Sequence, residues 1–72
     1  MLVFKHTTLK DAVEQFNRYN AHKIAIADPK VASLTIDGIF GTTNTHHFAE
    51  VVQAIFGLQV HSDGTTTLIS RK

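Results

Sequence analysis

The chain has no cysteine, a single proline and few charged residues. Without cysteine it can form no disulfide, thiolate metal site or thiol nucleophile. Its seven basic residues are scattered and its net charge is +1, so it lacks the clustered Lys and Arg that bind nucleic acid or anionic membranes. No apolar run approaches the roughly 20 residues of a membrane-spanning helix. These absences leave a small globular domain with no evident catalytic or nucleic-acid site.

The chain is short for a domain that also holds a cofactor. Its 72 residues make one domain over positions 1–72, and 43% of them are hydrophobic. A chain of this size buries only about 60% of the surface that its unfolded form exposes, so its stability should be small. A cofactor pocket would compete with the core for apolar residues, and we expect no cofactor. We expect the segment to be one domain of a longer protein.

The first part of the chain predicts a strand followed by a helix. Residues 2–6 are apolar and β-prone. Thr8 is a good N-cap for a helix, with Asp11 three residues later. The apolar stripe of this helix is formed by Leu9, Ala12, Val13 and Phe16. Asn20 is a plausible left-handed residue at its end.

Two further strands are predicted next. Residues 23–28 alternate around two isoleucines, and Pro29 ends this strand because it has no N–H to donate. Residues 30–33 should form a turn or a single helical turn. In the following strand, one face is formed by Leu34, Ile36, Gly38 and Phe40. Gly38 inside this strand indicates a bulge or a helix packed close to the backbone.

The last part predicts a second helix and a hairpin. Asn44 or Thr45 should cap the helix, and Gly57 should end it. The apolar stripe of this helix is expected to be Phe48, Val51, Val52 and Ile55. Strands at 58–61 and 65–70 are joined by Asp63-Gly64, which is typical of a type I′ turn with two positive φ angles. The order is β-α-β followed by β-α-β-β.

Several short runs now point to one known family. They are Phe16-Asn17-Arg18-Tyr19-Asn20, Ala27-Asp28-Pro29, the stretch from Gly38 to Phe48, Phe56-Gly57-Leu58-Gln59-Val60 and the Gly64 hairpin. Together they resemble the C-terminal region of FecR-type transmembrane anti-sigma regulators, over nearly the whole chain. The Asn-Arg-Tyr-Asn run and the Asp-Pro step are specific only in combination with the stretch that follows them.

The resemblance implies an α+β fold similar to the short N-terminal domain of secretins and TonB-dependent transducers. In that fold, two β-α-β units place two helices between a two-stranded and a three-stranded sheet. The resemblance also implies a periplasmic domain of an inner-membrane protein. Such a domain binds the signalling domain of a TonB-dependent outer-membrane transporter in cell-surface signalling of iron, siderophore or haem uptake. A part absent from this chain would hold the sigma factor. We expect no enzymatic activity.

Six side chains are candidates for contact with such a partner: Arg18, Tyr19, Asp37, His46, His47 and Phe56. Arg18 and Tyr19 end the first helix, where the helix dipole also favours a cation and a tyrosine is often half-buried. Asp37 is expected on the outer face of its strand. Phe56 lies one residue off the apolar stripe, so it either covers a sheet edge or is exposed for binding.

Five histidines raise the question of a metal site. His46 and His47 are adjacent, so on a helix they point about 100° apart and do not face one metal. His6 and His61 would meet only if the first and fourth strands were neighbours. We therefore expect solvated histidines and no metal. FecR-type proteins more often have acidic or small residues at the His46-His47 positions, and this departure bears on the choice of partner.

Two alternative functions remain. The first has the same fold but a different role, and the second is a different class of binding module. The chain resembles, less closely, the short N-terminal domain of a transducer or secretin itself. A membrane helix before this segment in the parent gene would favour the regulator, and a large β-barrel after it would favour the transducer. The third hypothesis is a module that binds a small ligand or peptidoglycan, which requires a concave site that the sequence does not locate.

Overall fold

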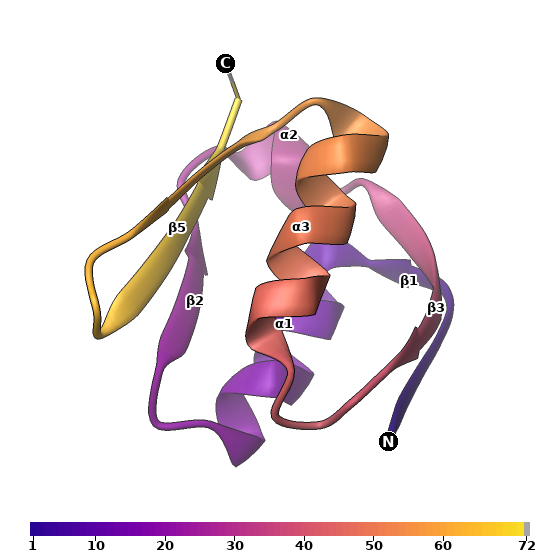
Figure 1. The fold of residues 1–72 in the computed structure, drawn as a ribbon. Helices are drawn as coiled ribbons and strands as arrows, with labels where there is room; N and C mark the ends of the chain where they lie inside the picture. The colour runs from indigo at the N-terminus through magenta and orange to yellow at the C-terminus, as the bar shows by residue number, and fades with distance from the viewer. Residues whose placement is uncertain (72) are drawn as a thin grey trace.

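The computed structural model describes residues 1–71, in which two small sheets enclose the helices (Figure 1). The elements are β1 (Leu2–Thr8), α1 (Leu9–Tyr19), β2 (Lys23–Ile26), α2 (Pro29–Ala32), β3 (Thr35–Phe40), α3 (Thr45–Phe56), β4 (Gln59–Ser62) and β5 (Thr66–Ser70). β1 pairs antiparallel with β3. The other sheet has the order β2-β5-β4, with β5 parallel to β2 and antiparallel to β4. The predicted α+β sandwich is confirmed.

Helix α1 begins as predicted and ends differently. The Thr8 hydroxyl accepts a hydrogen bond from the Asp11 N–H at 3.2 Å, and the predicted apolar stripe is buried. Asn20 has φ −129° and ψ 138°, so the predicted left-handed stop is wrong. Its side-chain amide donates to the Phe16 carbonyl at 2.9 Å, and the Lys23 ammonium donates to two more carbonyls at this end. Because side chains satisfy these carbonyls, no left-handed residue is needed.

Helix α3 has the predicted caps but a different buried face. The Asn44 side chain accepts from the His47 N–H at 3.1 Å, and Gly57 ends the helix with φ 65°. Ile55 is 61% exposed, so its place in the predicted stripe is wrong. Phe56 continues the line of buried residues because it follows Val52 by four positions, whereas Ile55 lies about 100° away around the helix. Phe56 packs against the core.

The core under the two-stranded sheet is aromatic. β1, α1, β3 and α3 each contribute one buried phenylalanine, and these four side chains form the aromatic cluster: Phe4, Phe16, Phe40 and Phe48. Every pair of these rings has its centroids between 4.8 and 6.3 Å apart. The core under the three-stranded sheet is aliphatic and includes Ile24, Val31, Leu58 and Ile69.

A bulge interrupts the pairing of β1 with β3. Phe4 lies opposite Gly38 and Thr7 opposite Ile36, so β1 has one extra residue in this interval. His6 lies in the bulge with φ 50°, and its N–H donates to the Asp37 carboxylate at 2.7 Å. The bulge predicted from Gly38 therefore exists, but in the partner strand. Gly38 itself has φ 152°, and a Cβ there would come within 3.2 Å of the Phe40 ring.

The β4–β5 hairpin forms where it was predicted, with a different turn. Gly64 has φ 94°, but Asp63 is not among the described residues with positive φ, so the predicted type I′ turn is wrong. The Asp63 carboxylate instead accepts from the N–H groups of Thr65 and Thr66 at 3.1 and 2.9 Å. A side chain that binds its own turn in this way replaces the need for a second left-handed residue. The single helical turn after β2 is confirmed as α2.

Candidate protein-binding surfaces

The two edges of the three-stranded sheet differ in what covers them. At the β2 edge, the Asn17 side chain donates to the Ile24 carbonyl at 3.0 Å and accepts from the Ile24 N–H at 2.8 Å. A primary amide presents one donor and one acceptor side by side, as a neighbouring strand does. The last turn of α1 therefore occupies the position where another strand would pair with Ile24.

The β4 edge faces a groove. β4 is the orange strand that lies outermost beside β5 in Figure 1. A hollow of about 330 Å³ lies between this strand and α3, with Val60 and Ser62 on one wall and His46 and Ala49 on the other. At one end, the His22 Nε2 lies 2.8 Å from the Thr67 hydroxyl. A free strand edge beside a helix is the arrangement that several peptide-binding domains use.

A second hollow lies at the C-terminal end of α3. Its volume is about 430 Å³, and its lining includes the buried side chains of Val31 and Leu58 together with Phe56. Lys30 and Arg71 stand at its rim.

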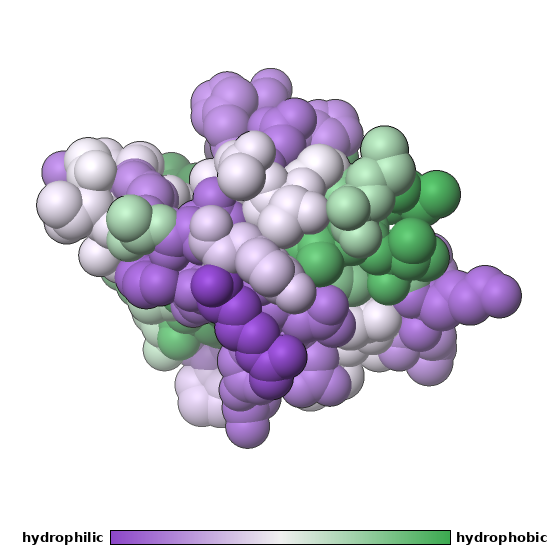
Figure 2. Space-filling view, turned by 90° about the horizontal axis from the view of Figure 1, so that it is seen from below, coloured by the Kyte–Doolittle hydropathy of each residue, from purple (hydrophilic) through white to green (hydrophobic). Residues whose placement is uncertain are grey.

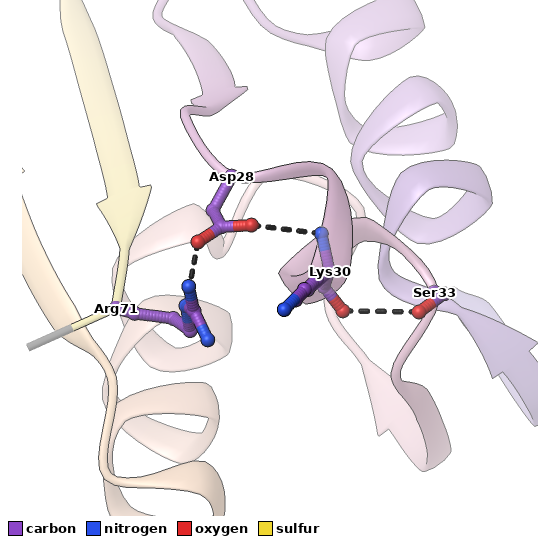
Figure 3. A network of polar contacts seen from close by, with 4 residues as sticks. All are labelled: Asp28, Lys30, Ser33 and Arg71. Atoms are coloured by element: carbon purple, nitrogen blue, oxygen red, sulfur yellow. Dashed lines mark hydrogen bonds and ion pairs between the residues drawn. The ribbon is translucent and has the colours of Figure 1, made fainter.

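Arg71 also belongs to a polar network that joins β5 to α2 (Figure 3). Its Nε donates to the Asp28 carboxylate at 2.5 Å. The other oxygen of Asp28 accepts from the Lys30 N–H at 2.8 Å, so Asp28 caps α2. The Lys30 hydrogen bond, followed by that from Arg71, holds the pKa of Asp28 below its ordinary value of 3.8. The carboxylate therefore stays ionised and ties the end of β5 to the start of α2.

The outer face of the two-stranded sheet exposes an apolar pair. Val3 and Ile39 lie opposite each other in the β1–β3 register and are 63% and 62% exposed. Figure 2 shows hydrophobic residues gathered on the right-hand side of the molecule, where Figure 1 places β1 and β3. Asp37 of the same sheet is exposed, and its carboxylate accepts a hydrogen bond from the His6 N–H.

The six residues predicted to contact a partner do not form one surface. Arg18 and Tyr19 are exposed at the end of α1; Tyr19 is 59% exposed. Asp37 is exposed on β3, as expected, and its carboxylate secures the bulge. The structure thus places these three on separate elements from the groove beside β4.

The other three predicted residues belong to α3 and are also separated. His46 faces the groove beside β4, and its Nε2 lies 3.2 Å from a Glu50 carboxylate oxygen. The His47 ring lies 5.5 Å from the Phe40 ring, on the side of the two-stranded sheet. Phe56 lines the second hollow, so it covers the core rather than projecting freely. Of the six predicted residues, His46 and Phe56 line the two hollows described above.

The histidines do not gather. β1 and β4 belong to different sheets, so the condition for His6 to meet His61 fails. Within residues 1–71, no group of three or more His, Asp or Glu side chains is placed to hold a metal ion. No helix in this part of the chain is long and apolar enough to cross a membrane.

Sequence reasoning missed the residues that distinguish the two edges. Asn17 was noted only as part of a motif, yet its amide covers the β2 edge. Ala49 was not singled out, although this buried small residue leaves room beside β4. Neither residue differs locally from an ordinary helix residue. Their roles depend on which strand lies beside each helix.

Comparison with known proteins gives no match in sequence and clear matches in structure. No family model matches the chain, and no curated protein matches it. A chain in the atomic model of the Salmonella SPI-1 type III secretion injectisome basal body proteins InvG, PrgH and PrgK superposes with a TM-score of 0.83 at 18% identity, over 99% of this chain and 15% of the other.

Two crystal structures described as an anti-sigma factor from Parabacteroides distasonis ATCC 8503 also superpose. Their TM-scores are 0.79 and 0.77, each at 17% identity, over 99% of this chain and 34% and 33% of theirs. The fold is shared. It is the α+β sandwich that the resemblance to secretin and TonB-transducer domains implied. The present chain spans about a third of the length of the anti-sigma structures.

Proposed function

We propose that this chain is a signal-receiving protein-interaction domain of a FecR-like anti-sigma regulator. The observation that carries the proposal is the superposition of 99% of the chain on structures described as an anti-sigma factor. The motifs quoted above for FecR-type regulators support the same reading. In such a protein, the domain would lie in the periplasm and bind the signalling domain of a TonB-dependent outer-membrane transporter.

The physical properties of the domain are consistent with binding a protein. Within residues 1–71, its short sheets leave a strand edge with unpaired backbone groups, and such edges accept strands from partners. One of the hollows on its surface has apolar and cationic side chains in its lining. No motif for phosphate binding or nucleophilic catalysis accompanies them in the sequence.

The test is titration of this chain with the signalling domain of the TonB-dependent transporter encoded beside its gene. We expect a one-to-one complex by calorimetry and gel filtration, because specific transient interfaces usually reach micromolar affinity. Absence of binding at about 100 μM would contradict the proposal. A transporter signalling domain encoded at a distant locus is the matched control and should bind more weakly.

A second candidate function follows from the injectisome structure. Its TM-score of 0.83 supports a domain of a secretin-like assembly. For this candidate we propose that copies of the chain associate with one another. Sedimentation of the chain alone separates the two candidates. Self-association at micromolar concentration, together with no binding to the signalling domain, would favour the assembly.

A further inference from the structure

We infer that an extended segment of a partner protein binds by adding as a strand to the free edge of β4, in the groove beside α3. This inference deepens the proposed function, because it names the docking site and the conformation of the partner. It depends on the backbone of β4, on the contrast with β2 and on the shape of the groove.

Within residues 1–71, the phase of the β4–β5 ladder leaves the backbone N–H and C=O groups of two β4 residues without a bond to β5. The Asp63 N–H donates to the Thr66 carbonyl, and Ser62 lies opposite Thr67. Bonded and non-bonded pairs alternate along an antiparallel ladder. His61 and Gln59 therefore bond to β5, whereas Val60 and Ser62 direct their N–H and C=O groups away from it. These outward groups form a template for a further strand.

The β2 edge does not offer the same template. The Asn17 amide already satisfies both backbone groups of Ile24, and the Lys23 ammonium binds carbonyls at the end of α1. A strand that approached β2 at Ile24 would have to displace the two bonds of the Asn17 amide. The two edges of one sheet therefore differ in availability, and β4 is the edge that accepts a partner.

The groove limits which side chains the added strand can carry. Alternate side chains of a strand point to opposite faces, so one set would face α3. Ala49 is only 7% exposed and adds little bulk, and Val60 is half-buried. Next to them, Thr45 and Ser62 bring hydroxyl groups to the same hollow. The partner segment should thus alternate, with small or medium apolar side chains facing α3 and a hydrogen-bonding side chain near Ser62.

Charge plays a minor part at this site. His46 lines the groove but lies beside Glu50, and both nitrogens of the His22 ring have partners, at the Gly64 carbonyl and the Thr67 hydroxyl. Main-chain hydrogen bonds, rather than ion pairs, would supply the affinity. Binding by this edge should consequently depend little on salt concentration.

Two pairs of variants test the inference. Ser62→Pro removes an outward N–H without removing a bond to β5, and Ser62→Ala keeps that N–H as its control. Ala49→Gln fills the groove, and Ala54→Gln places the same side chain at an exposed position of the same helix. We expect each test variant to weaken binding about tenfold, since one lost hydrogen bond or a blocked groove costs about 1.4 kcal/mol. Each control should bind like the unchanged chain.

Two probes keep this inference separate from the proposed function. The first is the transporter signalling domain, and the second is a phage-displayed library of random peptides about ten residues long, the upper length of a typical strand. For a bound peptide, the Val60 and Ser62 amides should become protected from hydrogen exchange. The unchanged chain and all four variants are measured with both probes.

The outcomes distinguish the two ideas. If the signalling domain binds Ser62→Pro and Ala49→Gln as tightly as the unchanged chain, the inference that the partner adds to the β4 edge is wrong, while the proposed function stands. If only library peptides bind, and the Ser62→Pro and Ala49→Gln variants weaken their binding, β4 is the docking edge but the proposed partner is wrong. If neither probe binds, both ideas are wrong.

Discussion

β1 and β3 pair over a packed aromatic cluster, whereas β2, β5 and β4 are fixed by polar side chains that bind backbone groups. In the first sheet, four phenylalanine rings from four elements contact one another. Around the second sheet, Asn17 binds the edge of β2, Asp28 joins α2 to Arg71, and Asp63 closes the hairpin. One half is held mainly by buried area and the other has many directional bonds.

This difference shows where a small domain can place a binding edge. Removing one ring from the aromatic cluster costs stability, because it leaves a cavity in the core. Polar tethers act one at a time, and each can be present or absent without disturbing the packing beneath. The three-stranded sheet can therefore have one covered edge and one open edge over the same aliphatic core.

The largest expected effect is loss of a ring from the aromatic cluster. Phe16→Ala should destabilise the fold by about 3–5 kcal/mol, which is comparable to the total stability of a domain of this size. We expect the variant to be largely unfolded by circular dichroism at 25 °C. Phe16→Leu keeps most of the volume and should fold with a lower urea midpoint. Native-like stability of Phe16→Ala would show that the cluster is not the basis of this half.

A smaller effect is expected at the glycine that faces the same cluster. Gly38→Ala combines a strained backbone with a Cβ 3.2 Å from the Phe40 ring and should cost about 3 kcal/mol. Gly64→Ala is the control: its φ is also positive, but a Cβ there meets nothing within 4 Å. Urea denaturation of both variants measures the contribution of the ring contact. Equal losses of stability in the two variants would mean that backbone strain alone accounts for the cost, with no contribution from the ring contact.

The polar half should respond more weakly to a single change. Asn17→Ala leaves the Ile24 N–H and C=O without their partner and should cost about 2 kcal/mol. Arg18→Ala, at the next and exposed position, should stay within about 0.5 kcal/mol of the unchanged chain. If the Asn17 amide also blocks the addition of a strand to β2, Asn17→Ala should increase aggregation in light scattering. A variant as stable and as soluble as the control would contradict both roles of Asn17.

The smallest effect is a pH dependence confined to the polar half. Hydrogen bonds lower the pKa of Asp28, mainly from the Lys30 N–H, and that of Asp63, mainly from the Thr66 N–H. The unfolded chain then binds protons more readily, so both groups stabilise the fold above their ordinary pKa of 3.8. This contribution is lost as the pH falls through the lower folded values.

The measurement is urea denaturation between pH 5 and pH 2, which brackets the ordinary carboxyl pKa values. We expect stability to fall with pH more steeply in the unchanged chain than in the double variant Asp28→Asn, Asp63→Asn. Amide exchange should show β5 and the hairpin weakening before β1 and β3. Parallel curves for the two proteins would mean that these carboxylates do not contribute.

Local signals allowed much of the fold to be predicted from the sequence. Thr8 and Asn44 cap helices with their own side chains, and Gly57 takes a left-handed conformation. Each of these depends on residues within one turn. The strand predicted over residues 23–28 ends earlier, at Ile26, and Pro29 begins α2 instead. The prediction that a two-stranded and a three-stranded sheet enclose the helices came from the family resemblance, not from these signals.

Features that depend on distant residues were not predictable. The choice of Phe56 over Ile55 is made by what lies beside the end of α3. Asn20 does not need to be left-handed, because its own side chain and a lysine satisfy the carbonyls there. The parallel pairing of β2 with β5 and the hydrogen bonds from the Asn17 amide to Ile24 depend on the tertiary arrangement. The open edge at β4 is a consequence of that pairing.

The central position of β5 has a consequence for how the domain is made. β2 and β4 each pair with β5 and not with each other. During synthesis, β2 is complete long before β5, the strand with which it pairs, leaves the ribosome, while β1 and β3 can already associate. Late contacts of this kind slow folding and leave strands exposed. We therefore expect nascent chains that stop before Thr66 to need protection by chaperones, and to remain protease-sensitive until the final strand inserts.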